Sequence, residues 1–381
     1  MKKTKYLIVG GGPAGITAIE GIRQRDKNGP IILVDREGEQ LYSKVNFHLY
    51  LEGKISKEQL YLKPDNFYRA NAVELVRGKV NDISLDKNAQ LESGEEVVFE
   101  KLILCCGGAP RQLAVPGADS PNVFNFYSLQ DIEKIHAVLA SRSKFLIVGG
   151  GFITLDLIDA LIKLGKEIVL VVRDARLLQE KVGERGSEII TRAISRGKVR
   201  CVFSAEAKSF DGTSAILSDG QKVDFDLCIV AIGIAPNLEI AKKLSLKIGR
   251  GVIVDNHQKT SLDWAFAAGD ICEFEDPNSN EMMMPGNWFY AINSGRIAGT
   301  NAAGGDLKNE TVPRVSKALF GKQLNFVGNI NSKFETKEIA EGEKYVQVYL
   351  KDGKLVGAAM INAGDDFSKI INSLGKEYST G

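Results

Sequence analysis

Two short apolar runs, each followed at once by three glycines, dominate the hydrophobic pattern of this chain. Residues 6–9 precede glycines 10–12, and residues 145–148 precede glycines 149–151. An apolar run of this length predicts a buried strand of a parallel sheet, and the periodicity after each turn predicts a helix. Strand, glycine turn and helix in this order are typical of dinucleotide-binding units. One such turn is also compatible with an ordinary strand-to-helix connection, whereas two predict that two dinucleotides bind.

The first glycine turn has the spacing that a bound pyrophosphate requires. Gly10 permits a tight turn, Gly12 lets the backbone approach the pyrophosphate, and Gly15 allows the helix to pack closely on the strand. The next apolar run ends at Asp35, 20 residues after Gly15, where a carboxylate can bind ribose hydroxyls. Alternatively, Asp35 caps a helix or stabilises a turn. The residues expected to contact this dinucleotide are Gly10, Gly12, Pro13, Ala14, Gly15, Asp35 and Arg36.

The second glycine turn departs from this pattern at its third position. Gly149 and Gly151, followed by Phe152 and Ile153, fit the pyrophosphate of a nicotinamide dinucleotide. Thr154 stands where the pattern has glycine or alanine. Because a β-branched side chain there separates helix from strand, we expect a looser or shifted site.

The end of the following apolar run favours NADPH as the second nucleotide. Val172 stands where a carboxylate would bind the ribose of NADH. Arg173 and Arg176 follow, and arginines can pair with a 2′-phosphate. Arginines in such loops are also common as solvated charges, so NADH stays an alternative. A second site that has lost its nucleotide is a further alternative.

Composition describes an ordinary globular protein of two or three domains. The chain has 381 residues, of which 44% are hydrophobic and 25% charged. A net charge of +1 gives no reason to expect nucleic acid or an anionic membrane as a partner. No apolar run approaches the roughly 20 residues that span a bilayer, and the N-terminal residues do not resemble a signal peptide. We therefore expect a cytoplasmic protein.

The five cysteines show no pattern of redox or metal chemistry. They form no C-x-x-C or C-x4-C pair, and most lie in apolar runs: Cys105, Cys106, Cys201, Cys228 and Cys272. Buried free thiols are the favoured interpretation. A redox role for the adjacent pair stays open, although neighbouring cysteines close a strained ring. The three histidines are scattered, so we expect no metal site.

Four further motifs carry a resemblance to a known family over nearly the whole chain. They span residues 101–111, 229–237, 260–271 and 287–298. With the two glycine turns, they resemble the flavoprotein reductases of the pyridine nucleotide-disulfide oxidoreductase superfamily. In that family the first two motifs are crossovers between domains, the third holds the flavin ribitol through an aspartate, and the fourth is a helix that caps the flavin. The first crossover departs from the family at Cys105, Cys106 and Gly108.

The resemblance implies an α/β fold with two Rossmann-like dinucleotide-binding domains, the FAD domain being discontinuous, and a small α+β C-terminal domain. Residues 1–108 and 238–309 would bind FAD, residues 109–237 would bind NAD(P)H, and residues 310–381 would form a C-terminal interface domain. Further implied cofactor contacts are Cys106, Gly107, Arg111, Gly149, Gly151, Phe152, Ile153, Arg173, Arg176, Gly233, Gly269, Asp270 and Trp288. Taken alone, Asp270 is also compatible with a helix cap, and Trp288 with a core residue.

Two residues are expected to act in catalysis. Asp156 stands where the family usually has a glutamate near the nicotinamide. Lys44 belongs to a Tyr-x-Lys segment that resembles the branch of rubredoxin, ferredoxin and nitrite reductases, although residues 45–47 depart from it. A lysine beside the flavin could stabilise negative charge on the reduced ring. Alternatively, Lys44 is a solvated surface charge.

The family's redox-active thiols are missing from their usual places. The helix after the first turn contains no cysteine, the inserted domain has no C-x-x-C, and residues 41–47 hold no single thiol. Electrons are therefore expected to leave directly from the flavin.

The segment after residue 310 predicts strands and a closing helix. Runs at residues 345–350 and 355–361 flank an Asp-Gly turn and predict a hairpin, and a further strand-like run covers residues 324–328. A helix is expected over residues 365–374. Residues 273–285, with three consecutive methionines, are expected to form a loop that is either an adaptable partner surface or packed in the core.

These observations favour an FAD-dependent NAD(P)H oxidoreductase with NADH or NADPH as donor. The expected acceptor is rubredoxin, a ferredoxin or an iron–sulfur subunit, and neither nucleic acid nor a membrane is expected as a partner. Two alternatives stay open: an electron-transfer subunit of a larger dehydrogenase, and a flavin-binding sensor with an impaired nicotinamide site.

Overall fold

The computed structural model describes residues 1–378, and the chain divides into two compact units. The first unit comprises Met1–Ser43, Tyr61–Ala109 and Pro236–Arg314; the second comprises Lys44–Leu60, Pro110–Ala235 and the chain from Val315 onward. Two of the passages from one unit to the other lie in short strands that pair with each other, β7 (Gly108–Pro110) and β16 (Ile234–Pro236). The others lie at residues 43–44, 60–61 and 314–315.

The first unit is built on a mixed sheet with strand order β3-β2-β1-β6-β5-β4, and β18 pairs with β6. Strands β1, β2, β3, β6 and β18 run parallel, while β4 and β5 are antiparallel to their neighbours. The strands are β1 (Lys2–Val9), β2 (Ile31–Asp35), β3 (Val73–Arg77), β4 (Val80–Ile83), β5 (Asn88–Leu91), β6 (Glu96–Leu104) and β18 (Ala265–Ala267). Both faces of β1 are buried, because Leu7 and Val9 pack in one apolar cluster and Tyr6 and Ile8 in another.

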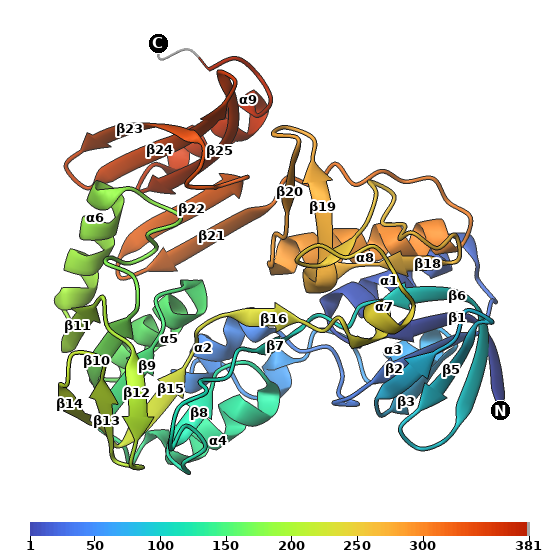
Figure 1. Cartoon of the computed structure of the whole chain (residues 1–381), viewed down its shortest axis with the longest axis horizontal. Coiled ribbons are helices and arrows are strands. Elements are labelled where there is room, and N and C mark those ends of the chain that lie inside the picture. The colour runs from blue at the N-terminus through green and yellow to red at the C-terminus, as the bar shows by residue number, and fades with distance from the viewer. Residues whose placement is uncertain (379–381) are drawn as a thin grey trace. The chain divides into compact units, whose positions relative to one another are not determined.

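Helices α1 (Pro13–Arg25) and α8 (Trp288–Ala302) pack against each other in the first unit, although more than 250 residues separate them (Figure 1). Glycines make the close approach possible. A Cβ atom at Gly295 or Gly299 would overlap the carbonyl oxygen of Ala14 or Ala18. The remaining elements are α3 (Phe67–Ala70), α7 (Glu239–Lys243), η3 (Gly269–Ile271) and a small sheet of β17 (Val252–Ile253), β19 (Cys272–Asp276) and β20 (Glu281–Met283).

The second unit contains a five-stranded parallel sheet with order β11-β10-β9-β15-β8. Its strands are β8 (Val123–Asn125), β9 (Lys144–Val148), β10 (Glu167–Val172), β11 (Val199–Phe203) and β15 (Leu227–Val230). The accompanying helices are α2 (Phe47–Leu51), α4 (Leu129–Leu139), α5 (Phe152–Lys163) and α6 (Glu184–Ser195), with short 3-10 turns η1 (Lys44–Asn46) and η2 (Glu58–Leu60). An antiparallel sheet of β12 (Ala207–Phe210), β13 (Ser214–Leu217) and β14 (Lys222–Asp224) completes this part.

The C-terminal segment adds a second five-stranded sheet, with order β21-β22-β25-β24-β23. The predicted hairpin is confirmed, because β24 and β25 pair across Asp352 and Gly353, which both have positive φ. The prediction missed two strands; β23 presents only exposed residues and therefore lacks an apolar pattern. The elements are β21 (Arg314–Leu319), β22 (Lys322–Gly328), β23 (Glu335–Glu341), β24 (Lys344–Lys351), β25 (Lys354–Ile361), η4 (Gly364–Asp366) and the expected helix, α9 (Phe367–Ser373).

The methionine-rich segment is a hairpin, so the expectation of a loop was wrong. Strands β19 and β20 pair antiparallel, and the Asp276 carboxylate accepts hydrogen bonds from the backbone and hydroxyl of Ser279 in the connecting turn. Met283 is 9% exposed and belongs to the core, whereas Met282 is 38% exposed. Alternation along a strand therefore divides the methionines between core and surface.

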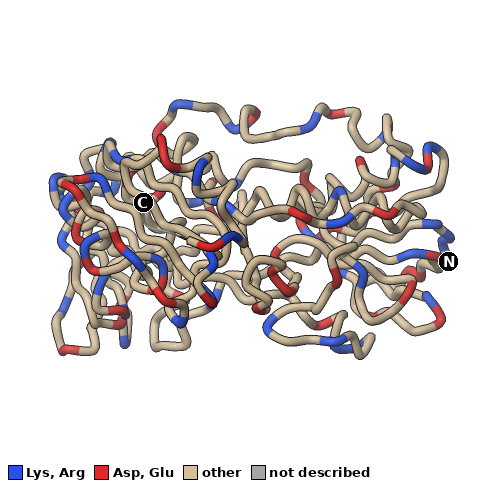
Figure 2. The backbone as a smooth tube through the Cα atoms, turned by 90° about the horizontal axis from the view of Figure 1, so that it is seen from above, with Lys and Arg blue, Asp and Glu red and all other residues tan. Residues whose placement is uncertain are grey.

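Charges of both signs are distributed along the whole described chain (Figure 2). This matches the nearly balanced 49 basic and 48 acidic residues. Across residues 1–378, every helix is too short or too polar to traverse a bilayer.

The contact between α1 and α8 gives the first prediction. Gly299→Ala places a methyl group against the Ala18 carbonyl oxygen, so we expect a loss of about 1–3 kcal/mol in the free energy of unfolding. Arg296→Ala, at an exposed position of the same helix, should change it by less than about 0.5 kcal/mol. Urea unfolding measures both, and equal stabilities of the two variants would contradict this account of the packing.

Candidate functional site

The first glycine turn is shaped by close backbone contacts on one side and open space on the other. Gly10 has φ +107°, and a Cβ there would overlap the Cys105 carbonyl oxygen. A Cβ at Gly15 would likewise overlap the Gly10 carbonyl oxygen. In contrast, a Cβ at Gly12 would meet nothing within 4 Å. The N-terminus of α1, with its unsatisfied N–H groups, therefore borders open space suited to a phosphate.

Asp35 lies at the end of β2, directly beside this turn. Its Oδ1 accepts a hydrogen bond from the Gly11 N–H at 2.8 Å, and its Oδ2 accepts from Gly38 at 2.8 Å and Glu37 at 3.1 Å. These backbone donors fix the carboxylate at the edge of the turn. The adjacent Arg36 is exposed.

The third motif, residues 260–271, lies beside the first glycine turn. Gly269 has φ +80°, and a Cβ there would lie 3.0 Å from the Ala14 Cβ. The Gly269 N–H donates to the fully buried Ser294 hydroxyl of α8 at 3.0 Å. Asp270 follows within η3, and Trp288 is the first residue of α8. The first unit thus joins Gly10, Ala14, Gly15, Gly269 and Asp270 around one helix N-terminus.

The residues of the two predicted crossovers lie in or next to the paired strands β7 and β16. Asn237 donates from its backbone N–H to the Gly107 carbonyl at 3.0 Å and from its side chain to the Cys106 carbonyl at 2.8 Å. Arg111 donates from its backbone N–H to the Gly233 carbonyl at 3.0 Å. The two crossovers are therefore tied to each other by backbone hydrogen bonds.

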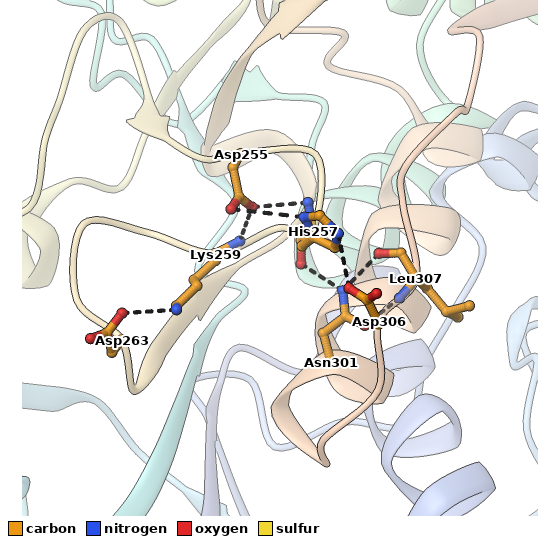
Figure 3. A network of polar contacts seen from close by, with 7 residues as sticks. All are labelled: Asp255, His257, Lys259, Asp263, Asn301, Asp306 and Leu307. Atoms are coloured by element: carbon orange, nitrogen blue, oxygen red, sulfur yellow. Dashed lines mark hydrogen bonds and ion pairs between the residues drawn. The ribbon is translucent and has the colours of Figure 1, made fainter.

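A polar network holds the far end of α8 and the loop before β18 (Figure 3). The Asn301 side chain donates to the carbonyl groups of His257 and Leu307, at 2.9 and 2.8 Å, and accepts from the Leu307 N–H at 2.7 Å. His257 Nε2 lies 3.1 Å from Asp306 Oδ1. Because this loop leads into β18 and Asp270, the network helps to fix the third motif, residues 260–271.

The second glycine turn repeats the geometry of the first. Gly149 has φ +124°, and a Cβ there would overlap the Ala231 carbonyl oxygen, whereas a Cβ at Gly151 would meet nothing within 4 Å. A Cβ at Gly150 would lie 2.9 Å from Val172 Cγ1, just as one at Gly11 would lie 2.9 Å from Asp35 Cγ. Val172 therefore occupies the structural position of Asp35, with an apolar side chain.

The two arginines after Val172 differ in their surroundings. The Arg173 side chain is 77% exposed, and its guanidinium contacts Asp174 at 3.4 Å. The Arg176 side chain instead lies against the backbone that follows it, and its Nη2 donates to the carbonyl groups of Gln179 and Val182 at 3.5 and 3.4 Å. Arg173 is thus the more accessible of the two.

The two expected catalytic residues both belong to the second unit. Lys44 Nζ lies 3.5 Å from the centroid of the Tyr127 ring, a cation–π contact. The Asp156 carboxylate accepts a hydrogen bond from Lys317 Nζ at 2.5 Å. Burial raises the pKa of Asp156, and the Lys317 ammonium opposes that rise. Nothing in the sequence points to Lys317, because no local motif links β21 to α5.

Phe152 and Ile153 begin α5 and face different surroundings. The Phe152 ring packs edge-to-face on Phe326 of β22 at 4.6 Å, whereas Ile153 is 43% exposed. Phe326, like Lys317, comes from the C-terminal sheet and was not foreseen.

The cysteines are free thiols. Burial raises the pKa of all five, that of Cys106 to about 12. At neutral pH they are therefore protonated and poor nucleophiles. Within residues 1–378, no three His, Cys, Asp or Glu side chains are grouped so as to hold a metal ion.

Comparison with known proteins assigns the family. The pattern that defines the family described as pyridine nucleotide-disulphide oxidoreductase matches residues 4–295. The chain belongs to this family. It is therefore an oxidoreductase, and the resemblance stated from its motifs is confirmed.

Similar proteins extend over nearly the whole chain. An NADH-rubredoxin oxidoreductase of Clostridium acetobutylicum is 27% identical, over 98% of this chain and 96% of its own. A rubredoxin-NAD(+) reductase of Pseudomonas putida is 26% identical, over 93% and 95%. The solved ferredoxin reductase for the CYP199A2 system from Rhodopseudomonas palustris superposes with a TM-score of 0.90 at 26% identity, covering 99% of this chain and 96% of that one. The expected α/β fold is confirmed.

Thr154 provides a prediction about the second turn. It is fully buried, and its hydroxyl has no hydrogen-bond partner among the described residues, whereas the Thr17 hydroxyl of α1 donates to the Pro13 carbonyl at 2.8 Å. Thr154→Val removes an unsatisfied polar group and should raise the free energy of unfolding by about 1 kcal/mol. Thr17→Val should lower it by about 1 kcal/mol. Urea unfolding of both variants tests this contrast, which is contradicted if Thr154→Val is the less stable.

Proposed function

We propose that this protein is a cytoplasmic FAD-dependent oxidoreductase that passes electrons from NAD(P)H to a small redox protein of the rubredoxin or ferredoxin type. The observation that carries the proposal is the pair of glycine turns, each with open space at the N-terminus of a helix. The full-length similarity to rubredoxin and ferredoxin reductases supports this class of acceptor.

FAD is proposed to bind to residues 1–108 and 238–309. Gly12 and the start of α1 would receive its pyrophosphate, Asp35 its ribose and Asp270 its ribitol. When bound, FAD accepts electrons in pairs from a nicotinamide and releases them singly. Trp288, Cys106 and Gly107 remain proposed contacts.

NAD(P)H is proposed to bind to residues 109–237. Gly149, Gly151 and the start of α5 would receive the pyrophosphate, with Asp156 accepting a hydrogen bond from the nicotinamide amide. Val172 supplies no carboxylate to repel a 2′-phosphate, and the exposed Arg173 supplies a donor for one. NADPH is therefore the proposed preference.

A second candidate is an electron-transfer subunit of a larger dehydrogenase. It is favoured by one relative, the epsilon subunit of the NADH-dependent phenylglyoxylate dehydrogenase of Aromatoleum evansii, which is 25% identical over 95% of this chain and 89% of its own. Under this candidate the protein would co-purify with partner subunits and transfer electrons slowly to free carriers.

Reduction of a carrier protein tests the proposed function. With NADPH or NADH, the purified flavoprotein should bleach added rubredoxin or ferredoxin. Prior treatment with iodoacetamide should leave the rate within about twofold, because the thiols are protonated and no relay passes through them. Rapid flavin reduction without transfer to either carrier would favour the subunit candidate, and loss of activity on alkylation would contradict transfer directly from the flavin.

Arg173 tests the nucleotide preference. Removing a charge-assisted contact to a 2′-phosphate costs about 1.5 kcal/mol, so Arg173→Ala should lower kcat/KM for NADPH about tenfold and leave that for NADH within about twofold. Arg200→Ala, at an exposed arginine of β11 bonded to Gln221, is the matched control and should change neither. Equal losses with both nucleotides would contradict recognition of the phosphate by Arg173.

A further inference from the structure

The C-terminal sheet covers one face of α5, the helix that follows the second glycine turn. Phe152, Asp156 and Asp159 lie on this face, because residues three or four apart along a helix share a side. Phe326 packs on Phe152 at 4.6 Å, Lys317 donates to Asp156 Oδ2 at 2.5 Å, and the Phe320 N–H donates to Asp159 Oδ1 at 2.8 Å. Strands β21 and β22 thus reach the first turns of a helix whose N-terminus borders open space.

The contact between Lys317 and Asp156 is a largely buried ion pair. Their side chains are 16% and 12% exposed. The contact between Phe152 and Phe326 of the neighbouring strand β22 already joins this sheet to α5. A buried ion pair is also weak evidence of stabilisation, since apolar residues of similar volume often serve as well. A role beyond docking the strand therefore explains the pair better.

Other charged groups around Asp156 do not replace Lys317. On α5 itself, Lys163 pairs with Asp159 and contacts Glu52 of α2 at 3.4 Å. His48 of α2 also opposes the rise in the pKa of Asp156, after Lys317, while Asp159 adds to it. Lys317 is the strongest of the groups that favour the charged carboxylate, so its removal leaves that charge largely uncompensated.

We propose that Lys317 is a positioning residue of the nucleotide site. By pairing with Asp156 it holds that carboxylate ionised and in one orientation, one helical turn beyond Phe152, as an acceptor for the nicotinamide nucleotide. This rests on the proposed function, because it takes the second glycine turn as the nucleotide site. The C-terminal segment then contributes to nucleotide binding through a side chain that never contacts the nucleotide.

The experiment measures the dissociation constant of oxidised nucleotide, NADP⁺ and NAD⁺, by calorimetry on the flavin-loaded protein. It is repeated from about pH 5.5 to about pH 8.5, because burial raises the pKa of Asp156 and removal of Lys317 takes away the ammonium that opposes this rise. The variants are Lys317→Met, Lys317→Arg and Asp156→Asn. Lys344→Met is the matched control, because Lys344 is an exposed lysine of the same sheet that pairs with Asp366. If Lys317→Met does not fold, Lys317→Gln replaces it.

The expected results separate positioning from a merely structural role. Lys317→Met should bind about tenfold more weakly than wild type at the acid end and recover as the pH rises, since a one-unit shift changes the ionised fraction up to tenfold. Lys317→Arg and Lys344→Met should follow wild type, and Asp156→Asn should bind weakly at every pH. Wild-type binding by Lys317→Met, or an equal loss at every pH, overturns the proposal and leaves the proposed function standing. Failure of the wild-type protein to bind either nucleotide overturns both.

Discussion

The close approach of two helix backbones is the constraint on which the first site depends. Gly295 and Gly299 of α8 contact the backbone of α1 so closely that a Cβ on either would overlap a carbonyl oxygen. Only with α8 seated there can Ser294 receive the Gly269 N–H and set the turn that carries Asp270 beside the start of α1. A motif near residue 270 thus reaches a turn formed by residues 10–15, because α8 has no side chains at Gly295 and Gly299, where it meets the backbone of α1.

The second unit uses the same turn with different chemistry at its edge. At both turns, the last residue of the next strand lies beside the middle glycine of the turn. In the first unit this residue is Asp35, whose carboxylate is held by three backbone donors, and in the second unit it is Val172. The backbone geometry of the turn is therefore kept while the side chain at its edge is exchanged. Asp156 is a second difference, since it pairs with Lys317, a lysine from a sheet far along the chain.

The sequence predicted what local patterns determine. Glycine spacing and apolar runs located both turns, their strands and their helices, and the Asp-Gly turn located the β24–β25 hairpin. Contacts between distant segments left no such pattern: Lys317 and Phe326 are ordinary strand residues until the fold brings them to α5. The methionine hairpin was mistaken for a loop because its polar turn hid the short strands on either side, and β23 was missed because it buries nothing.

Anaerobic stopped-flow absorbance is the most direct test of the central claim, that the two turns bind a flavin and the nicotinamide nucleotide that reduces it. The yellow protein is mixed with NADPH and, separately, with NADH, and the flavin band is followed. We expect rapid bleaching by at least one nucleotide, faster with NADPH. Absence of bleaching with both would contradict it, and would mean that the turn at Gly149–Gly151 holds no reducing nucleotide and that the flavin is reduced from elsewhere.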